Sequence, residues 1–220
     1  MTLRNNGQST IYLLRHAHSV ANNRGILAGQ KLGISLSSKG KAQAIALIPV
    51  LEKLSLSCIH TSPLQRCLET IEPFARTHPN LSIEEDSAFI EMHYGQWSGS
   101  KLALLSRKSL WRQIQKEPSG VRFPEGESFA EMASRAIEGI EKLRGVKGNH
   151  LVISHGDVIR VIINHYLGNH LDNFQRLSID PASLSSLSFH KERISIHTIN
   201  STQSAAPHSG STLGGGGGEK

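Results

Sequence analysis

The chain is poor in the residues that build metal and redox centres. It contains two cysteines, Cys58 and Cys67, and only four aspartates among its 220 residues. Neither the Cys-x-x-Cys nor the His-Glu-x-x-His spacing of zinc sites is present. Both cysteines fall on apolar faces of predicted elements, so we expect reduced core thiols of a cytoplasmic protein rather than a disulfide. The 12 histidines alone do not indicate a metal site, and we expect neither a metal nor another cofactor.

Long apolar runs and a concentrated charge of one sign are also absent. No stretch is long enough to span a bilayer, and no charged-then-apolar leader opens the chain. Lysine and arginine total 24 against 18 acidic residues, a net charge of +6, but the excess is scattered and aromatic residues make up only 5%. This composition indicates a modest attraction for anions, and we expect neither a nucleic acid nor a membrane as a partner.

Apolar runs typical of strands alternate with amphipathic segments typical of helices. This order predicts an α/β protein, a three-layer α/β/α sandwich with a mainly parallel central sheet. We expect one domain over residues 10–200, preceded by an N-terminal extension (1–9) and followed by a flexible tail rich in serine and glycine (201–220). The predicted strands are 11–14, 57–61, 150–154 and a hairpin of 182–189 with 194–199, and the predicted helices are 37–54, 63–75, 128–143 and 157–167.

Polar residues predict where the helices begin. Ser37 precedes the first long helix as its N-cap, and Pro49 should kink that helix or stop it early. Ser128 and Glu131 have the spacing of a capping box before a long apolar-periodic segment. Ser62 is expected to be the N-cap of the helix 63–75. The first of these helices should therefore be interrupted, and the other two should have sharp starts.

Ionisable residues lie close to the carboxyl ends of three predicted strands. Arg15 and His16 come directly after residues 11–14, Arg66 lies in the first turn after 57–61, and His155 follows 150–154. Open α/β sheets bind ligands at the carboxyl ends of their strands, so we expect these side chains to converge. Arginines hold phosphate oxygens and disfavour protonation of a nearby imidazole. Together with the carboxylate of Glu91, this set predicts a phosphoryl-transfer pocket.

In this combination the chain resembles the histidine phosphatase superfamily, the cofactor-dependent phosphoglycerate mutases and their phosphatase relatives. The resemblance runs from about residue 11 to about residue 168. The opening family motif, Arg-His-Gly with an acidic residue, Ser or Thr, and a later Asn, is matched by residues 15–19 and Asn22. Ala17 replaces the glycine and His18 the acidic residue, which would leave the pocket mouth less acidic. Residues 36–44 and 62–70 are similar to the two motifs that follow.

The resemblance implies a phosphoglycerate mutase-like fold and a role for each matched residue. His16 would attack phosphorus, and Glu91 would protonate the leaving oxygen and later activate water. Arg15, Arg66 and His155 would hold the equatorial phosphate oxygens. The implied catalytic residues are His16, Glu91, His155, Arg15 and Arg66, and the implied substrate-binding residues are Arg15, Asn22, Arg66, Tyr94, His155 and Gly156.

The same residues allow other assignments of the proton donor and of the reaction type. Asp157 is the rival proton donor, because some relatives place the acid beside the second histidine, but its position at a helix start would be explained by capping. A phosphate clamp of arginines would repel a metal cation. Neither cysteine has an arginine six residues later, which excludes the loop of cysteine-dependent phosphatases.

The sequence therefore predicts a metal-independent phosphomonoester hydrolase that forms a phosphohistidine and acts on a small phosphorylated metabolite. A phosphoglycerate mutase is the first alternative, and a non-catalytic protein that binds phosphorylated ligands is the second. The connection between Gly95 and Pro124 is shorter than the mutase insertion that the resemblance implies, which favours the phosphatase. Its six basic residues could bind the second acidic group of a phosphoglycerate, so the mutase function stays an alternative. A homodimer is possible.

Overall fold

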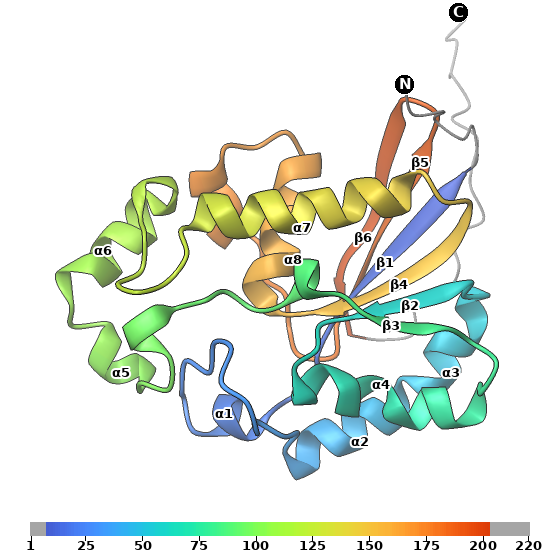
Figure 1. Cartoon of the computed structure of the whole chain (residues 1–220), viewed down its shortest axis with the longest axis horizontal. Coiled ribbons are helices and arrows are strands. Elements are labelled where there is room, and N and C mark those ends of the chain that lie inside the picture. The colour runs from blue at the N-terminus through green and yellow to red at the C-terminus, as the bar shows by residue number, and fades with distance from the viewer. Residues whose placement is uncertain (1–7, 203–220) are drawn as a thin grey trace, which may run out of the picture.

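The central sheet has six strands within residues 8–202, the part of the chain that the computed structural model describes. Their order is β3-β2-β4-β1-β5-β6 (Figure 1). The first four strands in this order are parallel, β5 is antiparallel to β1, and β6 is antiparallel to β5. The strands are β1 (Ser9–Arg15), β2 (Cys58–Thr61), β3 (Ile83–Glu85), β4 (Gly148–Ser154), β5 (Leu184–His190) and β6 (Arg193–Ser201). The predicted mainly parallel sheet and its final hairpin are confirmed.

Helices cover both faces of the sheet, as the predicted three-layer sandwich requires (Figure 1). One layer consists of α2 (Ser38–Ala46), α3 (Ile48–Leu51) and α4 (Gln65–Thr77). The other consists of α7 (Phe129–Arg144) and α8 (Gly156–Tyr166). Short elements complete the described chain: α1 (Val20–Asn23), α5 (Leu102–Leu105), α6 (Ser109–Lys116), and the 3₁₀ helices η1 (Glu52–Leu54), η2 (Ser87–Phe89), η3 (Gly95–Trp97), η4 (Pro118–Gly120) and η5 (Leu171–Arg176).

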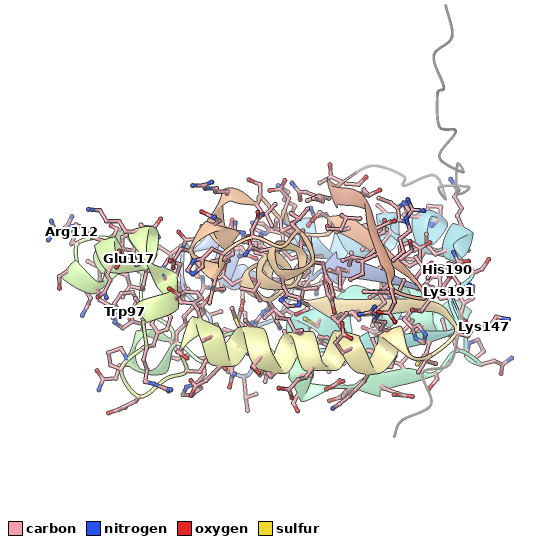
Figure 2. All side chains as sticks on the ribbon, turned by 90° about the horizontal axis from the view of Figure 1, so that it is seen from above. Trp97, Arg112, Glu117, Lys147, His190 and Lys191 are labelled. Carbon is pink, nitrogen blue, oxygen red and sulfur yellow. The ribbon has the colours of Figure 1, made fainter. Side chains whose placement is uncertain are left out.

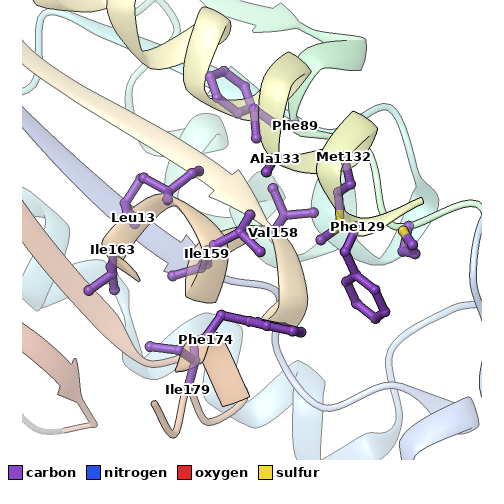
Figure 3. Packing of buried hydrophobic residues seen from close by; sticks show 14 of the residues in the cluster. Leu13, Phe89, Phe129, Met132, Ala133, Val158, Ile159, Ile163, Phe174 and Ile179 are labelled. Atoms are coloured by element: carbon purple, nitrogen blue, oxygen red, sulfur yellow. The ribbon is translucent and has the colours of Figure 1, made fainter. Parts of the chain in front are cut away.

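The central strand β1 is buried on both faces. Leu13 points to the α7 and α8 layer, and its neighbour Leu14 points to the layer of α2, α3 and α4; both side chains are fully buried. The larger core lies on the α7 and α8 side, where Phe89, Met132 and Val158 are fully buried (Figure 3). Because β1 is fixed from both sides, the residues that follow it have a rigid base.

Two of the predicted helix starts are confirmed in detail. The Ser37 hydroxyl accepts a hydrogen bond from the Gly40 amide, and the helix stops at Ala46, with Pro49 in the first turn of α3. The capping box before α7 is present, because the Ser128 hydroxyl accepts from the Glu131 amide and the Glu131 carboxylate accepts from the Ser128 amide. These starts depend on contacts only three residues apart, which the sequence displays directly.

The prediction that Ser62 caps the next helix is wrong. Helix α4 begins at Gln65, its N-cap is Leu64, and no side chain caps it. The Ser62 hydroxyl instead lies 2.8 Å from Nε2 of His155, which follows a different strand. At the start of α4 the hydroxyl accepts only one hydrogen bond, from the Leu64 amide at 3.4 Å.

The predicted domain limits fall close to the ends of the described chain. Strand β1 already includes Ser9, and β6 continues to Ser201, so the sheet extends one residue beyond the predicted domain at each end. The predicted N-terminal extension and tail lie almost entirely outside the described residues. Within the described residues no helix has both the length and the apolarity that crossing a bilayer requires.

The irregular segment between η2 and α7 forms one end of the molecule. It includes η3, α5 and α6, and it lies opposite the end where the β5–β6 turn is found (Figure 1). Figure 2 shows Trp97, Arg112 and Glu117 at this end, and Lys147 and Lys191 at the other. The Trp97 and Trp111 rings stack with centroids 6.4 Å apart.

Candidate active site

The carboxyl ends of β1, β2 and β4 meet at one edge of the sheet. The amide of His16 donates to the carbonyl of Ser154 at 2.9 Å, and the amide of Ser62 donates to the carbonyl of Ile153 at 2.9 Å. The residues after β1, β2 and β4 are therefore adjacent, as expected from their positions in a parallel sheet. A cavity of about 170 Å³ lies here. Its lining includes Arg15, His16, Asn22, Arg66, Glu91, Tyr94, Gly156, Asp157 and Arg160.

His16 is held as a neutral imidazole. Its Nδ1 lies 2.8 Å from the carbonyl of Ala17, which can only accept a hydrogen bond, so the ring proton is on Nδ1. Nε2 then has the free lone pair. Burial, followed by the guanidinium groups of Arg66 and Arg15, lowers the pKa of His16 well below its ordinary value. This ring is suited to act as a nucleophile through Nε2.

Arg15 and Arg66 each have a buried donor without a partner. Arg15 donates through Nη1 to the carbonyl of Ile179, and Arg66 donates through Nη2 to the carbonyl of Gly29 at 2.9 Å. Nε of Arg15 and Nη1 of Arg66 have no hydrogen-bond partner among the described residues. Buried polar groups are nearly always hydrogen-bonded, so two such donors beside one cavity indicate an anion site.

Gly156 provides space for this clamp. A Cβ atom at residue 156 would lie 3.3 Å from Cζ of Arg15, which is closer than an ordinary van der Waals contact. The resemblance implied that Gly156 binds the substrate. In the structure the absent side chain makes room for the Arg15 guanidinium.

His155 lies behind the cavity rather than in its wall. Its ring is fully buried, with its centroid 5.2 Å from that of His16. Nδ1 lies 3.2 Å from Nη2 of Arg66, which can only donate, so Nδ1 is unprotonated and the ring proton is on Nε2, toward the Ser62 hydroxyl. Burial and Arg66 lower the pKa of His155 well below its ordinary value. The predicted contact to a phosphate oxygen would need a proton on Nδ1.

Glu91 is a buried carboxyl group among charged side chains. Burial, followed by the negative charge of Asp157, raises its pKa to about 7, although Arg66 acts against this shift. One carboxyl oxygen accepts from the Met92 amide at 2.9 Å, and the other lies 3.7 Å from Nδ1 of His155. This raised pKa lets the carboxyl group hold a proton near neutral pH, so Glu91 can exchange a proton with a reacting oxygen.

The prediction that Asp157 serves as a helix cap is wrong. The N-cap of α8 is His155, without a side-chain capping bond. The Asp157 carboxylate instead accepts from the Tyr94 hydroxyl at 2.7 Å and from Nη1 of Arg160 at 3.1 Å. The carboxylate faces the cavity and raises the pKa of Glu91 through its charge. Both acidic residues are therefore at the site.

Asn22 lines the cavity, but its side-chain oxygen already accepts two hydrogen bonds. Oδ1 accepts from the Ser19 amide at 3.0 Å and from the Ser19 hydroxyl at 2.9 Å, as part of a capping box at α1. Any contact of Asn22 with a ligand would therefore use its amide nitrogen. Tyr94 lines the same cavity, where it was predicted to be a wall.

The two departures from the family motif lie outside the cavity. Ala17 is fully buried, its amide donates to the Thr70 hydroxyl at 2.9 Å, and it is not among the residues of positive φ. Alanine therefore causes no backbone strain. His18 does not line the cavity; its Nδ1 lies 2.8 Å from the Ser37 hydroxyl at the start of α2. The expectation that His18 makes the pocket mouth less acidic is wrong for this reason.

Two arginines at the site were not predicted. Arg160 lines the cavity, and its buried Nε has no hydrogen-bond partner among the described residues. Arg135 on α7 donates to the carbonyls of Ala88, Ile90 and Glu91, and so fixes the backbone that presents Glu91. Both lie inside helices, where an arginine usually extends into solvent. The only local signal was Asp157 three residues before Arg160.

A second cavity, of about 380 Å³, adjoins the first. The two share Leu27, Tyr94, Leu102, Asp157 and Arg160 as lining residues. The rest of the second lining is mostly aromatic and aliphatic, with Trp97, Trp111, Ile114, Gln115, Phe123, Phe129 and Gln175. The anion site therefore opens toward a largely apolar space that the segment between η2 and α7 helps to enclose.

Known proteins similar to this chain include phosphatases and a mutase. Phosphoserine phosphatase 1 of Hydrogenobacter thermophilus is 32% identical over 196 residues, which cover 87% of this chain and 92% of that protein. A protein of Erwinia tasmaniensis with the name probable phosphoglycerate mutase is 28% identical over 180 residues, covering 80% and 82%.

Solved structures agree on the fold. The mycobacterial glucosyl-3-phosphoglycerate phosphatase, solved in complex with VO3, has a TM-score of 0.78 at 25% identity over 87% of this chain and 98% of that one. The alpha-ribazole phosphatase of Shigella flexneri has a TM-score of 0.78 at 21% identity, covering 88% and 96%. The family model of the histidine phosphatase superfamily (branch 1) matches residues 11–202. This chain therefore belongs to the histidine phosphatase superfamily and is an enzyme of its branch 1.

Proposed function

We propose that the protein hydrolyses phosphomonoesters of a small phosphorylated metabolite through a phosphohistidine, without a metal ion. The observation that supports this most directly is the pairing of a free Nε2 on His16 with two unpartnered buried N–H groups, on Arg15 and Arg66. A nucleophile and donors for the transferred phosphoryl group are the parts that such a reaction needs. Two guanidinium groups at the same place would disfavour a cation.

In the first step, Nε2 of His16 attacks phosphorus and the bond from phosphorus to the ester oxygen breaks. Glu91 gives its proton to the departing oxygen, so that an alcohol leaves and the carboxylate remains. In the second step, water attacks the phosphohistidine and Glu91 takes its proton. The bond from phosphorus to nitrogen breaks, which releases inorganic phosphate and restores neutral His16. The raised pKa of Glu91, about 7, suits both directions of this proton transfer.

The three equatorial oxygens of the transferred group would be held by Arg15, Arg66 and His155. In this arrangement their charges and dipoles would stabilise the negative charge that collects on these oxygens in the transition state. For His155 this needs a proton on Nδ1. The ring can supply it by moving to its other tautomer, with Nε2 then accepting from the Ser62 hydroxyl.

The leaving group would occupy the second cavity. Its apolar lining favours a metabolite with a partly apolar or aromatic alcohol, and Arg160 and Asp157 at the junction provide the polar contacts. The six basic residues between Gly95 and Pro124 were the argument for the mutase alternative. They line neither described cavity. This distribution favours the hydrolase over the mutase.

The proposal includes a cytoplasmic location, because Cys58 and Cys67 are both free thiols. That the chain binds neither nucleic acid nor membrane, and that it can form a homodimer, remain predictions.

Trapping the phosphoenzyme tests the proposal. Brief incubation with a phosphomonoester and denaturation without acid should leave one phosphoryl group on His16, detected by mass spectrometry of peptides. His16→Ala should abolish the label and the turnover. Near-normal turnover of His16→Ala would contradict the assignment. Binding of phosphorylated ligands without turnover by the parent protein would favour the non-catalytic alternative.

Inhibitors test the absence of a metal in the reaction. Vanadate adopts the five-coordinate geometry of the transition state and should compete with substrate; the complex of the mycobacterial relative with VO3 supports this choice. Excess EDTA should leave turnover unchanged. Loss of turnover with EDTA that a divalent ion restores, in protein that circular dichroism shows to be still folded, would overturn the metal-independent reaction.

A further inference from the structure

Three residues with metal-binding side chains lie together at the edge of the sheet, away from the phosphate pocket. Cys58 and His60 are two residues apart on β2, so their side chains lie on the same face of the strand. Glu84 on the edge strand β3 is paired in register with His60. One ligand atom from each residue lies within 4.8 Å of the other two. Strand alternation and register therefore bring a thiol, an imidazole and a carboxylate to one point.

The imidazole of His60 makes no hydrogen bond that would explain its position. The residue is buried, and its Nε2 has no hydrogen-bond partner among the described residues. Its Nδ1 lies 3.6 Å from a carboxyl oxygen of Glu84, which is beyond hydrogen-bonding distance. Buried polar atoms without partners are rare and need an explanation. The atom that faces Glu84 is Nδ1 rather than Nε2, and Nδ1 makes no hydrogen bond to that carboxylate, so it is available to a ligand.

An ordinary ion pair does not account for the cluster. Nδ1 of His60 and the nearer Glu84 oxygen are 3.6 Å apart, which leaves no direct hydrogen bond between the ring and the carboxylate. Imidazole and carboxylate are both metal ligands, so an ion between them would account for their approach.

The spacing of the ligand atoms fits a tetrahedral divalent metal. With bonds of about 2.3 Å to sulfur and about 2.0–2.2 Å to nitrogen or oxygen, tetrahedral ligands lie roughly 3.4–3.6 Å apart. In this chain Sγ of Cys58 lies 3.7 Å from one Glu84 oxygen, and Nδ1 of His60 lies 3.6 Å from the other. The three ligand atoms lie within 4.8 Å of one another, so side-chain rotations would bring them to this spacing around one ion.

We propose that Cys58, His60 and Glu84 form a binding site for a divalent transition metal of the zinc class, with water as the fourth ligand. Sulfur, imidazole and carboxylate are the ligands that zinc takes from proteins. The Glu84 side chain is 60% exposed, so the site is open to solvent on one side. The site departs from the expectation that the chain binds no metal, which rested on motif spacings within one strand or helix. Here the third ligand comes from a neighbouring strand.

The role of this site is to hold the edge of the sheet. Strand β3 has three residues, all exposed, and pairs only with β2 among the described strands. An ion bound to both strands would join them, and binding only to the folded chain raises its stability by mass action. A thiol loses its proton when it binds a metal ion, so the affinity should increase with pH.

Cobalt substitution tests the site on the full chain freed of metal by chelation. Titration with Co²⁺ should produce a thiolate-to-cobalt charge-transfer absorption that saturates at one ion per chain, and Zn²⁺ should displace the cobalt. Cys58→Ser should abolish this absorption. Glu84→Gln should weaken Zn²⁺ binding by more than about tenfold, since losing even an outer-shell partner commonly costs about 10–100-fold.

Glu85→Gln is the matched control, because Glu85 is also exposed on β3 but points to the other face of the strand. This variant should bind Zn²⁺ like the parent. Zn²⁺ should also raise the melting temperature of the parent and of Glu85→Gln, but not that of Cys58→Ser. Circular dichroism at low temperature verifies that each variant is folded.

Three results would overturn the site. They are an absorption that persists in Cys58→Ser, equal Zn²⁺ affinities of Glu84→Gln and Glu85→Gln, and no saturable binding by the parent. Cys67→Ser should keep the absorption, which separates Cys58 from the other cysteine. The test is independent of the phosphatase proposal, because its readouts are absorption and melting rather than turnover.

Discussion

Arg66 and His155 share one hydrogen bond, in which Nη2 of Arg66 donates to Nδ1 of His155 across 3.2 Å. This contact fixes the tautomer of the imidazole, because a guanidinium has no lone pair to accept a proton. Nε2 then faces the Ser62 hydroxyl, which can either accept from the ring or donate to it. Ser62 is therefore a positioning residue for the second histidine.

Ser62→Ala should reduce kcat by about tenfold, equivalent to about 1.4 kcal/mol, which is the size of one hydrogen bond. The substitution removes the partner that His155 needs when its Nδ1 turns to a phosphate oxygen. Steady-state kinetics and a melting curve measure the effect. Ser154→Ala is the control, because this buried hydroxyl donates to the carbonyl of Phe89 instead. A loss of kcat that is equal in both variants would show a general structural effect.

Removing one guanidinium should cost far more than removing the hydroxyl. Arg66→Ala and Arg15→Ala should each reduce kcat/KM by about 30- to 1000-fold, or about 2–4 kcal/mol, as expected for a donor to developing charge. Arg76→Ala on the same helix as Arg66 should have no effect, since its side chain is 77% exposed. Reductions below about threefold in folded Arg66→Ala protein would argue against the clamp.

How far the sequence predicted this site depends on the range of each contact. The capping box at α7 and the interruption of the helix at Pro49 involve neighbours within four residues, and both were correct. The role of Ser62 was not, because its partner His155 lies 93 residues away. The same reason applies to Asp157, whose partner Tyr94 is 63 residues earlier. Local patterns indicate caps wherever a polar residue precedes a helix. Only the fold shows with which partner that side chain forms its hydrogen bond.

The convergence of the main site residues was predictable for a different reason. Parallel strands end at one edge of a sheet, so residues directly after β1, β2 and β4 meet without any knowledge of side-chain contacts. No such rule locates Glu91, which follows an irregular segment held in place by Arg135. Its identification came from the family resemblance. Arg160, inside a helix, had neither source of support.

The pKa of Glu91 gives a direction for the pH dependence. Its folded-state pKa of about 7 lies above the ordinary carboxyl value, so the acid form is present below pH 7 and is lost above it. The low pKa of His16 keeps the nucleophile unprotonated across this range. For alkyl phosphates, kcat/KM should therefore fall as the pH rises through about 7. A profile from pH 5 to 9 measures this limb.

Glu91→Gln should remove that limb and slow poor leaving groups selectively. Alkyl phosphates need the proton and should be slowed much more than aryl phosphates, whose departing oxygen is stable without it. The comparison uses kcat of both substrates at one pH, so that ionisation of the substrate phosphate cancels. Equal losses for both substrates would move the acid role to Asp157.

Asp157→Asn distinguishes a proton donor from a charge that adjusts its neighbour. Asp157 raises the pKa of Glu91 by its negative charge, second only to burial. Neutralising it should move the alkaline limb of kcat/KM to lower pH, while the preference for aryl leaving groups stays as in the parent. If Asp157→Asn shows the leaving-group selectivity expected of Glu91→Gln, Asp157 is the acid.

The relative rates of two reactions of the phosphohistidine distinguish a phosphatase from a mutase. They are hydrolysis and transfer of the phosphoryl group back to the bound intermediate. A mutase must shield its phosphohistidine from water while an intermediate reorients, and it needs cationic side chains for the second acidic group of a phosphoglycerate. Here the basic side chains of the 95–124 segment line neither described cavity, and Arg160 is the cation at the junction. We therefore expect release of inorganic phosphate from simple phosphomonoesters and slow or no interconversion of 3- and 2-phosphoglycerate. Both rates are measured on one preparation with 2,3-bisphosphoglycerate added, and His16→Ala serves as the blank. Mutase turnover far above phosphate release would contradict the hydrolase, because it would show that the phosphohistidine is shielded from water long enough for an intermediate to reorient.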